Sequence, residues 1–246
     1  EPLVLDSDKV LNFEMVELST NLDEIVITAE ESERISIKTP QMSVSKLNAT
    51  TIKQIPAVLG EIDVIKTLQM LPGVTNTGEG SSGFNVRGGA ADQNLVLLDE
   101  AIIYNTSHFF GFFSVFNTDA IKDIKLYKGD IPAKFGGRVS SVLNESKKDG
   151  NSKELGFSGG IGLISSRLTI ESPIFNDKGS FLVAGRTSYA HLIMKGIEEL
   201  KDDKISFYDL NLKTNYEINR NNRVYLSGYF GRDVFDISDV IKNNYG

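Results

Sequence analysis

The segment Tyr208-Asp209-Leu210-Asn211-Leu212-Lys213-Thr214-Asn215-Tyr216-Glu217-Ile218 alternates between apolar or small side chains and polar or charged ones. Successive side chains of a β-strand point to opposite faces of the sheet, so the alternation predicts a strand with one apolar and one charged face. This strand would be longer than the ~5–6 residues that are usual in soluble sheets. The segment therefore decides the fold of the C-terminal part of the chain.

The same alternation recurs on both sides of this segment. We expect five strands, over residues 153–164, 167–174, 180–189, 205–218 and 223–235. The connections alternate between short ones, such as 176–179, and a long one over 188–204. Long alternating strands with short turns on one side and long loops on the other are typical of an outer-membrane β-barrel. The alternative is a soluble β-sandwich, which usually has shorter strands.

Five strands cannot close a barrel around a domain of a hundred residues. A plugged barrel of the ~22-strand class needs more than ~200 strand residues. Fewer than 100 residues follow residue 150. We therefore expect the chain to be the N-terminal part of a longer protein.

Residues 46–147 have the pattern of a compact α/β unit. A helical period over 60–71 ends at Pro72-Gly73, and Leu95-Val96-Leu97-Leu98-Asp99 is a continuous apolar run that predicts a strand buried on both faces. Further strands are expected over 84–87 and 124–128, with a short helical turn over 117–123.

Residues 1–45 are predicted to be a tether. Ten acidic and only two basic residues lie within 1–36, in a chain whose net charge is −7. This distribution argues against a nucleic-acid partner, which needs a concentrated basic face. Residues 25–29 have strong strand preference within polar, aperiodic surroundings. They are either a free β-prone segment or an ordinary edge strand.

Several chemistries are excluded or left without support. The chain has no Cys, which rules out disulfides and thiolate metal sites, and only two His, far apart in the sequence. No apolar run has the length of a membrane-spanning helix, and residues 1–3 do not begin a secretory signal. We find no catalytic constellation, and we expect no enzyme activity, no cofactor and no metal site.

Three motifs have competing interpretations. Residues 78–83 match G-x-G-x-x-G, but a helix precedes them and a strand follows, the reverse of a dinucleotide site, so we expect an exposed loop. The cluster of five Phe within 109–116 is either core or a loop that contacts a ligand. Arg87, at the end of a strand, either pairs with carboxylates of an enclosing wall or is exposed to solvent.

These segments together resemble the TonB-dependent outer-membrane transporters, in the form found in Bacteroidetes. Residues 22–29 look like the TonB box, and 84–89 followed by 95–99 look like the central plug signature. Residues 124–129 and 132–142 are similar to the last section of the plug, and residues 1–18 to the end of a carboxypeptidase-regulatory-like domain. Glu100 departs from the family, which usually has Gly after the plug Asp, so the turn there is expected to differ.

The resemblance implies an α/β plug domain followed by the first antiparallel strands of a transmembrane β-barrel, which has 22 strands in the full chain. The implied division is residues 1–20 for the end of the regulatory-like β domain, 21–45 for TonB box and tether, 46–147 for the plug, and 148–246 for the first five barrel strands. The implied TonB-binding residues are Asp23, Glu24, Ile25, Val26, Ile27, Thr28 and Ala29.

The motifs and the resemblance together give two further sets of expected site residues. Plug anchoring is assigned to Arg87, Gly88 and Gly89. Loops expected to face the extracellular side and to form the floor of a ligand site contain Glu79, Ser81, Ser82, Tyr104, Asn105, His108, Phe109 and Phe110.

The function implied by the resemblance is energised uptake of a ligand through a plugged barrel in the outer membrane. The alternative is a barrel that acts as a scaffold or signalling receptor in a larger outer-membrane assembly. Expected partners are TonB of the inner-membrane energising complex and outer-membrane lipids. A surface lipoprotein is a further candidate partner, although the Gly-Tyr-Gly of the starch-utilisation branch does not follow the box.

Overall fold

The computed structural model describes residues 43–54, 57, 61–78, 83–196, 198 and 204–236. The helices and strands in these ranges are β1 (Val44–Asn48), α1 (Ala49–Lys53), α2 (Val64–Gln69), β2 (Val74–Asn76), β3 (Phe84–Val86), η1 (Ala91–Gln93), β4 (Asn94–Leu98), β5 (Ala101–Ile102), β6 (Ser107–His108), η2 (Phe109–Gly111), β7 (Phe113–Ser114), β8 (Ile121–Tyr127), β9 (Ser141–Lys147), β10 (Gly156–Ile161), β11 (Ser165–Ile174), β12 (Gly179–Ser188), α3 (Ala190–Met194), β13 (Lys204–Asn219) and β14 (Asn222–Asp236). None of the helices in this described part of the chain has the length and hydropathy of a membrane span.

The first layer is a mixed sheet with strand order β1-β8-β9-β4-β5. Strand β4 pairs parallel with β9, and all other pairs in this sheet are antiparallel. All five residues of β4 are buried, as the apolar run 95–98 predicts. Strand β9 was not expected from the sequence, and β8 begins at Ile121, three residues before the expected strand.

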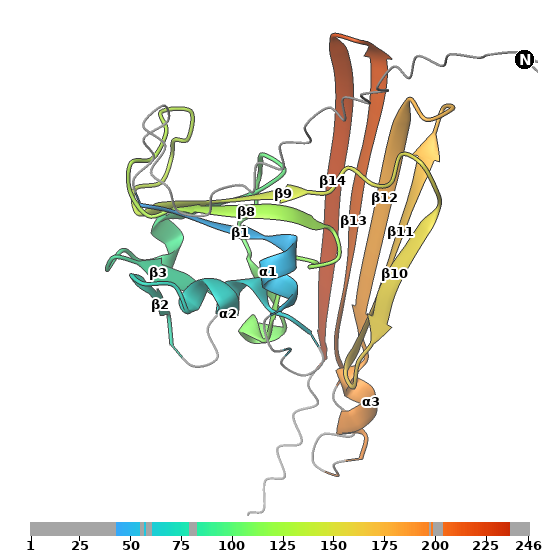
Figure 1. Cartoon of the computed structure of the whole chain (residues 1–246). Coiled ribbons are helices and arrows are strands. Elements are labelled where there is room, and N and C mark those ends of the chain that lie inside the picture. The colour runs from blue at the N-terminus through green and yellow to red at the C-terminus, as the bar shows by residue number, and fades with distance from the viewer. Residues whose placement is uncertain are drawn as a thin grey trace, which may run out of the picture. The chain divides into compact units, whose positions relative to one another are not determined.

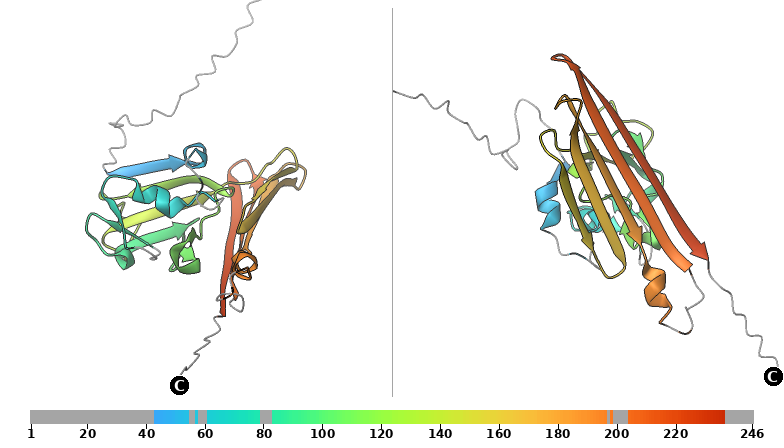
Figure 2. Two further views of the ribbon diagram at one scale, coloured as in Figure 1. Left: turned by 90° about the horizontal axis from the view of Figure 1, so that it is seen from below. Right: turned by 90° about the vertical axis from the view of Figure 1, so that its right-hand side faces the viewer.

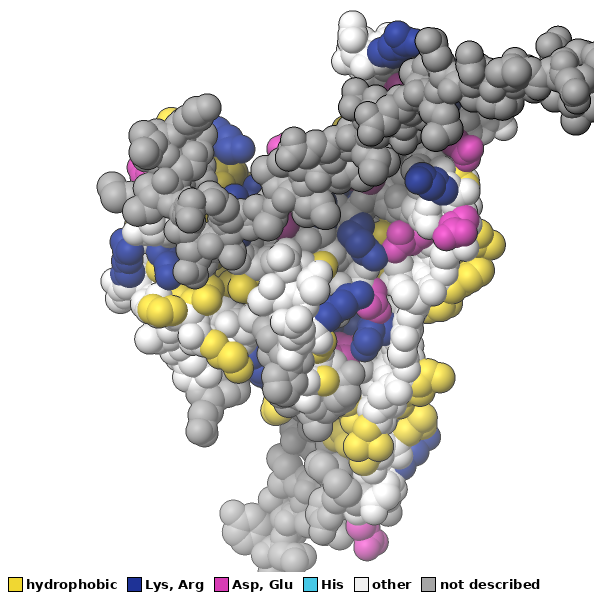
Figure 3. Space-filling model, in the orientation of Figure 1, with side chains coloured by type: hydrophobic (Ala, Val, Ile, Leu, Met, Phe, Trp, Pro, Cys, Tyr) yellow, Lys and Arg dark blue, Asp and Glu magenta, His cyan; other side chains and the backbone are white. Residues whose placement is uncertain are grey.

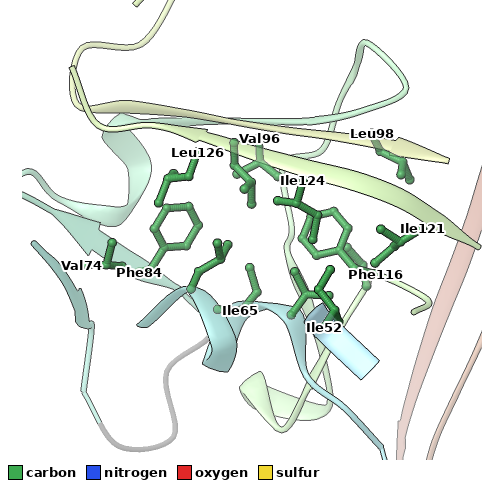
Figure 4. Packing of buried hydrophobic residues seen from close by; sticks show 14 of the residues in the cluster. Ile52, Ile65, Val74, Phe84, Val96, Leu98, Phe116, Ile121, Ile124 and Leu126 are labelled. Atoms are coloured by element: carbon green, nitrogen blue, oxygen red, sulfur yellow. The ribbon is translucent and has the colours of Figure 1, made fainter. Parts of the chain in front are cut away.

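Helices α1 and α2 cover one face of the mixed sheet and close its apolar core (Figures 1 and 2). Each helix is preceded by a polar residue whose side chain accepts a hydrogen bond from the backbone N–H three residues later. Asn48 Oδ1 accepts from the Thr51 N–H, and Asp63 Oδ1 accepts from the Lys66 N–H. Figure 4 shows Ile52 and Ile65 of the helices pointing toward Ile124 and Leu126 of β8 and the ring of Phe116. Each of these five side chains is at most 6% exposed, so this unit has a core of its own.

The second layer is an antiparallel sheet in which β10 to β14 follow one another in sequence order. We call it the long-strand sheet, since β13 and β14 contain 16 and 15 residues. All five expected strands are confirmed, with boundaries that differ by up to three residues. Short turns join β11 to β12 and β13 to β14, whereas the connection from β12 to β13 is long and contains α3.

The two faces of the long-strand sheet have the reverse polarity of a soluble sheet. On β13 the buried side chains are mostly polar: Phe207, Asp209, Asn211, Lys213 and Asn215. The exposed side chains on the other face are apolar: Tyr208, Leu210, Leu212, Tyr216 and Ile218. Hydrophobic side chains accordingly gather along the outer side of this sheet in Figure 3. A soluble sandwich would bury the apolar face, so the barrel interpretation is the one that fits.

The turn between β4 and β5 keeps its tight geometry without glycine. Asp99 and Glu100 form a two-residue hairpin loop, with φ angles of 45° and 71°. This is the left-handed region, where a residue with a Cβ costs roughly 1–2 kcal/mol. Glu100 thus occupies a left-handed position that favours glycine, and the backbone bears the strain; that this turn differs from the usual one of the family stays a prediction.

Replacing Glu100 by Gly is expected to raise the free energy of unfolding by about 0.5–1 kcal/mol, because Gly adopts a positive φ without steric cost. The Glu100 side chain is exposed, so its removal leaves no cavity. Chemical denaturation of the two proteins measures the difference. Glu100→Ala is the matched control, since it removes the same carboxylate but keeps the strained φ. Equal stabilisation by both variants would show that the carboxylate, not the backbone, is responsible.

Candidate functional site

The buried face of the long-strand sheet meets the α/β unit through charged side chains, and we define these contacts as the inner interface. The central residue is Arg186 on β12, whose side chain is 3% exposed. Its Nε and Nη2 lie 2.9 and 2.6 Å from Asp209 Oδ2 on β13, its register partner. Nη1 donates to Glu61 Oε2 (3.0 Å), and Nη2 also donates to the Ser114 carbonyl (2.6 Å). One guanidinium thus joins two strands of the long-strand sheet, which we also call the wall, to two segments of the α/β unit.

Arg167 on β11 forms a second contact beside the first. It is the register neighbour of Arg186, so the two side chains project from the same face of the sheet. Arg167 Nε donates to Asp119 Oδ2 at 2.7 Å, and Asp119 precedes β8 in the α/β unit. Each arginine therefore has its own carboxylate, which prevents repulsion between neighbouring cations.

Asp99 forms a third contact, further along the strands. Its Oδ1 accepts hydrogen bonds from the Lys147 backbone N–H (2.9 Å) and from Lys213 Nζ on β13 (3.2 Å). Its Oδ2 accepts from Ser227 Oγ on β14 (2.7 Å). The strained Asp99–Glu100 turn thus directs a carboxylate into the long-strand sheet, and backbone strain of this kind is common at functional positions.

Two ionisable groups of β9 next to Asp99 are also buried. Lys147 Nζ donates to Ser227 Oγ and to the Gly228 carbonyl, at 3.1 and 2.8 Å. Burial lowers the pKa of Lys147, while nearby Asp99 and Glu145 oppose this shift. Burial raises the pKa of Glu145 well above its usual range, because the charged form loses its hydration. The inner interface therefore contains groups whose charge is sensitive to the presence of water.

His108 forms a fourth contact, at the end of β13 where Lys204 pairs with Asp236 of β14. Its ring stacks on Phe207, with centroids 4.6 Å apart and planes 4° from parallel. His108 Nδ1 lies 3.1 Å from Asp233 Oδ1, and Nε2 lies 3.1 Å from the Tyr229 hydroxyl. His108 was expected to face a ligand; its side chain is buried against β13 and β14, and a ligand-facing role stays a prediction.

The other residues expected at a ligand site fall into two groups. Tyr104 and Asn105 lie with Gly83 at the rim of a cavity of about 430 Å³ in the α/β unit, which Phe84, Asn94 and Ile102 also line. Residues 79, 81 and 82 and the side chain of Phe110 lie outside the described residues, so a ligand floor stays a prediction. In the Phe cluster, Phe113 and Phe116 are buried, which confirms the core interpretation for those two; Phe112 is 48% exposed.

Arg87, Gly88 and Gly89, expected to anchor the unit, lie at the end of β3. Arg87 is exposed, and its Nη2 donates to Ser43 Oγ at 2.8 Å. Among the described residues it has no ion pair with a carboxylate. Its anchoring role toward a wall stays a prediction. The proposed TonB box, residues 23–29, lies outside the described residues.

Sequence reasoning did not identify Arg186, Glu61, Asp209 or Arg167 as site residues. A signal was present, since Arg167 and Arg186 stand at strand positions that alternate with the apolar outer face. Their partners could not be deduced, because Glu61 and Asp119 are 125 and 48 residues away in the sequence. Figure 3 shows basic and acidic side chains together where the long-strand sheet meets the α/β unit.

Comparison with known proteins assigns this architecture to a class. Residues 36–141 match the family model of the TonB-dependent receptor plug domain. The α/β unit is therefore a TonB-dependent receptor plug domain, and the long-strand sheet that follows it matches the barrels of solved receptors. The rest of the described chain shares the fold of the corresponding part of solved TonB-dependent receptors, as the resemblance of the sequence predicts. No curated protein sequence matches the chain.

Three solved structures illustrate the match. The siderophore receptor PirA from Pseudomonas aeruginosa is 17% identical, with a TM-score of 0.54 over 78% of this chain and 36% of that chain. FpvA from P. aeruginosa, bound to heterologous pyoverdines, is 11% identical, with a TM-score of 0.56 over 79% and 26%. The outer membrane transporter YddB from Escherichia coli is 12% identical, with a TM-score of 0.51 over 72% and 31%. The chain thus spans a quarter to about a third of these structures, and the likeness is one of fold.

Proposed function

We propose that this chain belongs to an outer-membrane receptor that imports a ligand through a plugged barrel, with energy supplied by TonB from the inner membrane. The observation that supports this function best is the inner interface. The plug has its own apolar core, yet it meets the wall through Arg186, Arg167, Asp99 and His108. Charged contacts can be exchanged for contacts with water, so they suit a domain that must move within the wall.

The location in the outer membrane is supported by the exposed apolar face of the long-strand sheet. Leu168 on β11, Leu210 on β13, and Leu226 and Phe230 on β14 are each 46–61% exposed. An apolar band of this kind on the outside of a sheet faces lipid in transmembrane barrels. Outer-membrane lipids are therefore the proposed partner of this face.

The proposed division of the chain follows the sequence analysis. Residues 1–20 end a carboxypeptidase-regulatory-like domain, 21–45 contain TonB box and tether, 46–147 form the plug, and 148–246 begin the barrel. Strand β1 starts at Val44, so the plug sheet extends two residues into the proposed tether. Asp23 to Ala29 would pair with TonB by adding a strand to it, which uses main-chain hydrogen bonds.

The second candidate function is a scaffold or signalling barrel within a larger outer-membrane assembly. The same lipid-facing sheet and the same plug would serve this role. The two functions differ in whether residues 23–29 bind TonB, and this difference can be tested.

Replacing Val26 by Pro is expected to weaken binding of the purified periplasmic domain of the host's TonB by at least about tenfold. Proline removes a backbone donor and cannot continue a paired strand. Val26→Thr is the matched control, since it keeps the shape and the backbone donor, and it should bind within about twofold of the wild type. Binding is measured by titrating the TonB domain into the receptor protein purified in detergent. Wild-type affinity in the Val26→Pro protein would refute the coupling role and favour the scaffold.

A further inference from the structure

The cavity of about 430 Å³ is lined by residues of the plug, and its back is apolar. Phe84 of β3 and Leu95 and Val96 of β4 form this back, and each is at most 6% exposed. The mouth lies at the edge strand β5 and the loop after it, where Ile102 and Tyr104 are 50% and 84% exposed. A concave site with an apolar back and a volume of ~300–1,000 Å³ is typical of small-molecule binding.

Two opposite charges also line this cavity. Asp92 lies in η1 and Arg138 in the loop before β9, and both residues are exposed. Among the described residues neither forms an ion pair, and the Arg138 guanidinium donates to the adjacent Gly137 carbonyl at 3.1 Å. A carboxylate and a guanidinium in one small cavity can therefore bind the two opposite charges of a ligand.

The loop that carries Arg138 is held in place by hydrogen bonds of Ser140. The Ser140 N–H donates to the Gln93 carbonyl at 3.0 Å, and Ser140 Oγ donates to the Val86 carbonyl at 2.9 Å. Gly89 permits this close approach, since a Cβ on it would lie 2.6 Å from Ser140 Cβ. The loop is thus fixed against η1 and the end of β3, which keeps Arg138 at the cavity.

A buried polar side chain, that of Asn94, belongs to the wall of the cavity. Its Nδ2 donates to the Phe84 carbonyl at 2.6 Å, and its Oδ1 accepts from Ser141 Oγ at 2.7 Å. Asn94 is therefore engaged in holding β3, β4 and β9 together. The charged groups that remain for a ligand are those of Asp92 and Arg138, so the ligand presents its charges to them and its apolar part to the back.

We propose that this cavity binds a short zwitterionic peptide with an apolar side chain. The peptide carboxylate pairs with Arg138, whose planar guanidinium can donate two parallel hydrogen bonds to it, and the amino group pairs with Asp92. The apolar side chain displaces water from Phe84, Leu95 and Val96, which favours binding. The import of such a peptide rests on the proposed function, but its binding does not.

Calorimetric titration of the full-length receptor, purified in detergent, with the dipeptide Leu-Phe tests this site. N-acetyl-Leu-Phe lacks the positive charge, and Leu-Phe amide lacks the negative one. Each capped form should bind at least about tenfold more weakly than the free dipeptide, because each loses a charge-assisted hydrogen bond. Arg138→Gln should bind the free dipeptide and its amide equally, and Asp92→Asn should bind the free and the acetylated dipeptide equally.

Lys134→Gln is the matched control, because Lys134 is an exposed cation of the same loop and is not among the described residues that line the cavity. It should distinguish the three peptides as the wild type does. If a variant does not insert correctly, the three peptides still decide the question on the wild type. Absence of dipeptide binding, or equal binding of the free and the capped forms, would overturn the proposal.

The titration is independent of energised uptake, so the two failures are distinguishable. A receptor that binds the dipeptide but does not import it would contradict the proposed function and leave the site in place. A receptor that imports another ligand and does not bind the dipeptide would contradict the site alone.

Discussion

Replacing Arg186 by Leu is expected to lower the free energy of unfolding by about 3–5 kcal/mol. The substitution leaves Glu61 and Asp209 buried without their shared cation, and an uncompensated buried charge is strongly destabilising. It also removes a donor from the Ser114 carbonyl. Chemical denaturation of the membrane-inserted protein gives the free energy, and hydrogen exchange of residues 61–70 and 107–116 reports whether the plug detaches first.

Arg167→Leu is the matched control for this experiment. Arg167 makes the same kind of contact with Asp119, but its side chain is 26% exposed, so water screens the pair and the expected loss is at most about 1 kcal/mol. A second control replaces Arg186, Glu61 and Asp209 together by Leu, which should recover part of the stability, because no charge is then left unpaired. If Arg186→Leu costs no more than Arg167→Leu, the central role of Arg186 is wrong.

Under the proposed function, a disulfide between Ala120→Cys and Ala184→Cys is expected to reduce energised ligand uptake at least tenfold. Ala120 lies in the plug just before β8 and Ala184 on β12, and both belong to one buried cluster with Leu182. A covalent link at this position prevents the plug from leaving the wall. The chain contains no native cysteine, so no other disulfide within it competes.

Uptake by cells that produce the double variant is compared before and after reduction, and reduction should restore it. The single variant Ala184→Cys is the control for the substitution itself. Undiminished uptake through a fully oxidised protein would mean that the ligand passes without movement at this contact. The plug would then open elsewhere.

The sequence predicted the architecture better than the site. Strict alternation over 208–218 fixed the course of β13, and the apolar run 95–98 predicted a buried strand, because each pattern reflects a local period. Strand β9 was missed, since Ser141-Val142-Leu143-Asn144-Glu145-Ser146-Lys147 mixes apolar and polar residues on buried positions. Its Glu145 and Lys147 are buried, and both lie near the charges of Asp99 and of Lys213 on β13.

The pairing of charges across the inner interface had no local signature. Arg186 and Asp209 are opposite each other because β12 and β13 are in one register, and Glu61 reaches them from a loop before α2. Nothing in the spacing of these residues predicts that meeting. His108 was chosen for its place in a Gly- and Phe-rich loop. Its ring stacks on Phe207 of β13, which no local pattern indicates, and the ligand-floor role of the loop stays a prediction.

The position of β1 at the edge of the mixed sheet has a mechanical consequence. The strand is held on one side only, by its antiparallel pairing with β8, from Val44–Tyr127 to Asn48–Asp123. A load applied at Ser43 first reaches the hydrogen bonds that Ser43 accepts from the Lys128 N–H and from Arg87, and then the Val44–Tyr127 pair. If the chain is drawn back over the sheet, the pairs break one after another, and if it is drawn along the strand axis, they bear the load together. The angle of the pull, more than the number of hydrogen bonds, therefore sets the force at which β1 leaves β8.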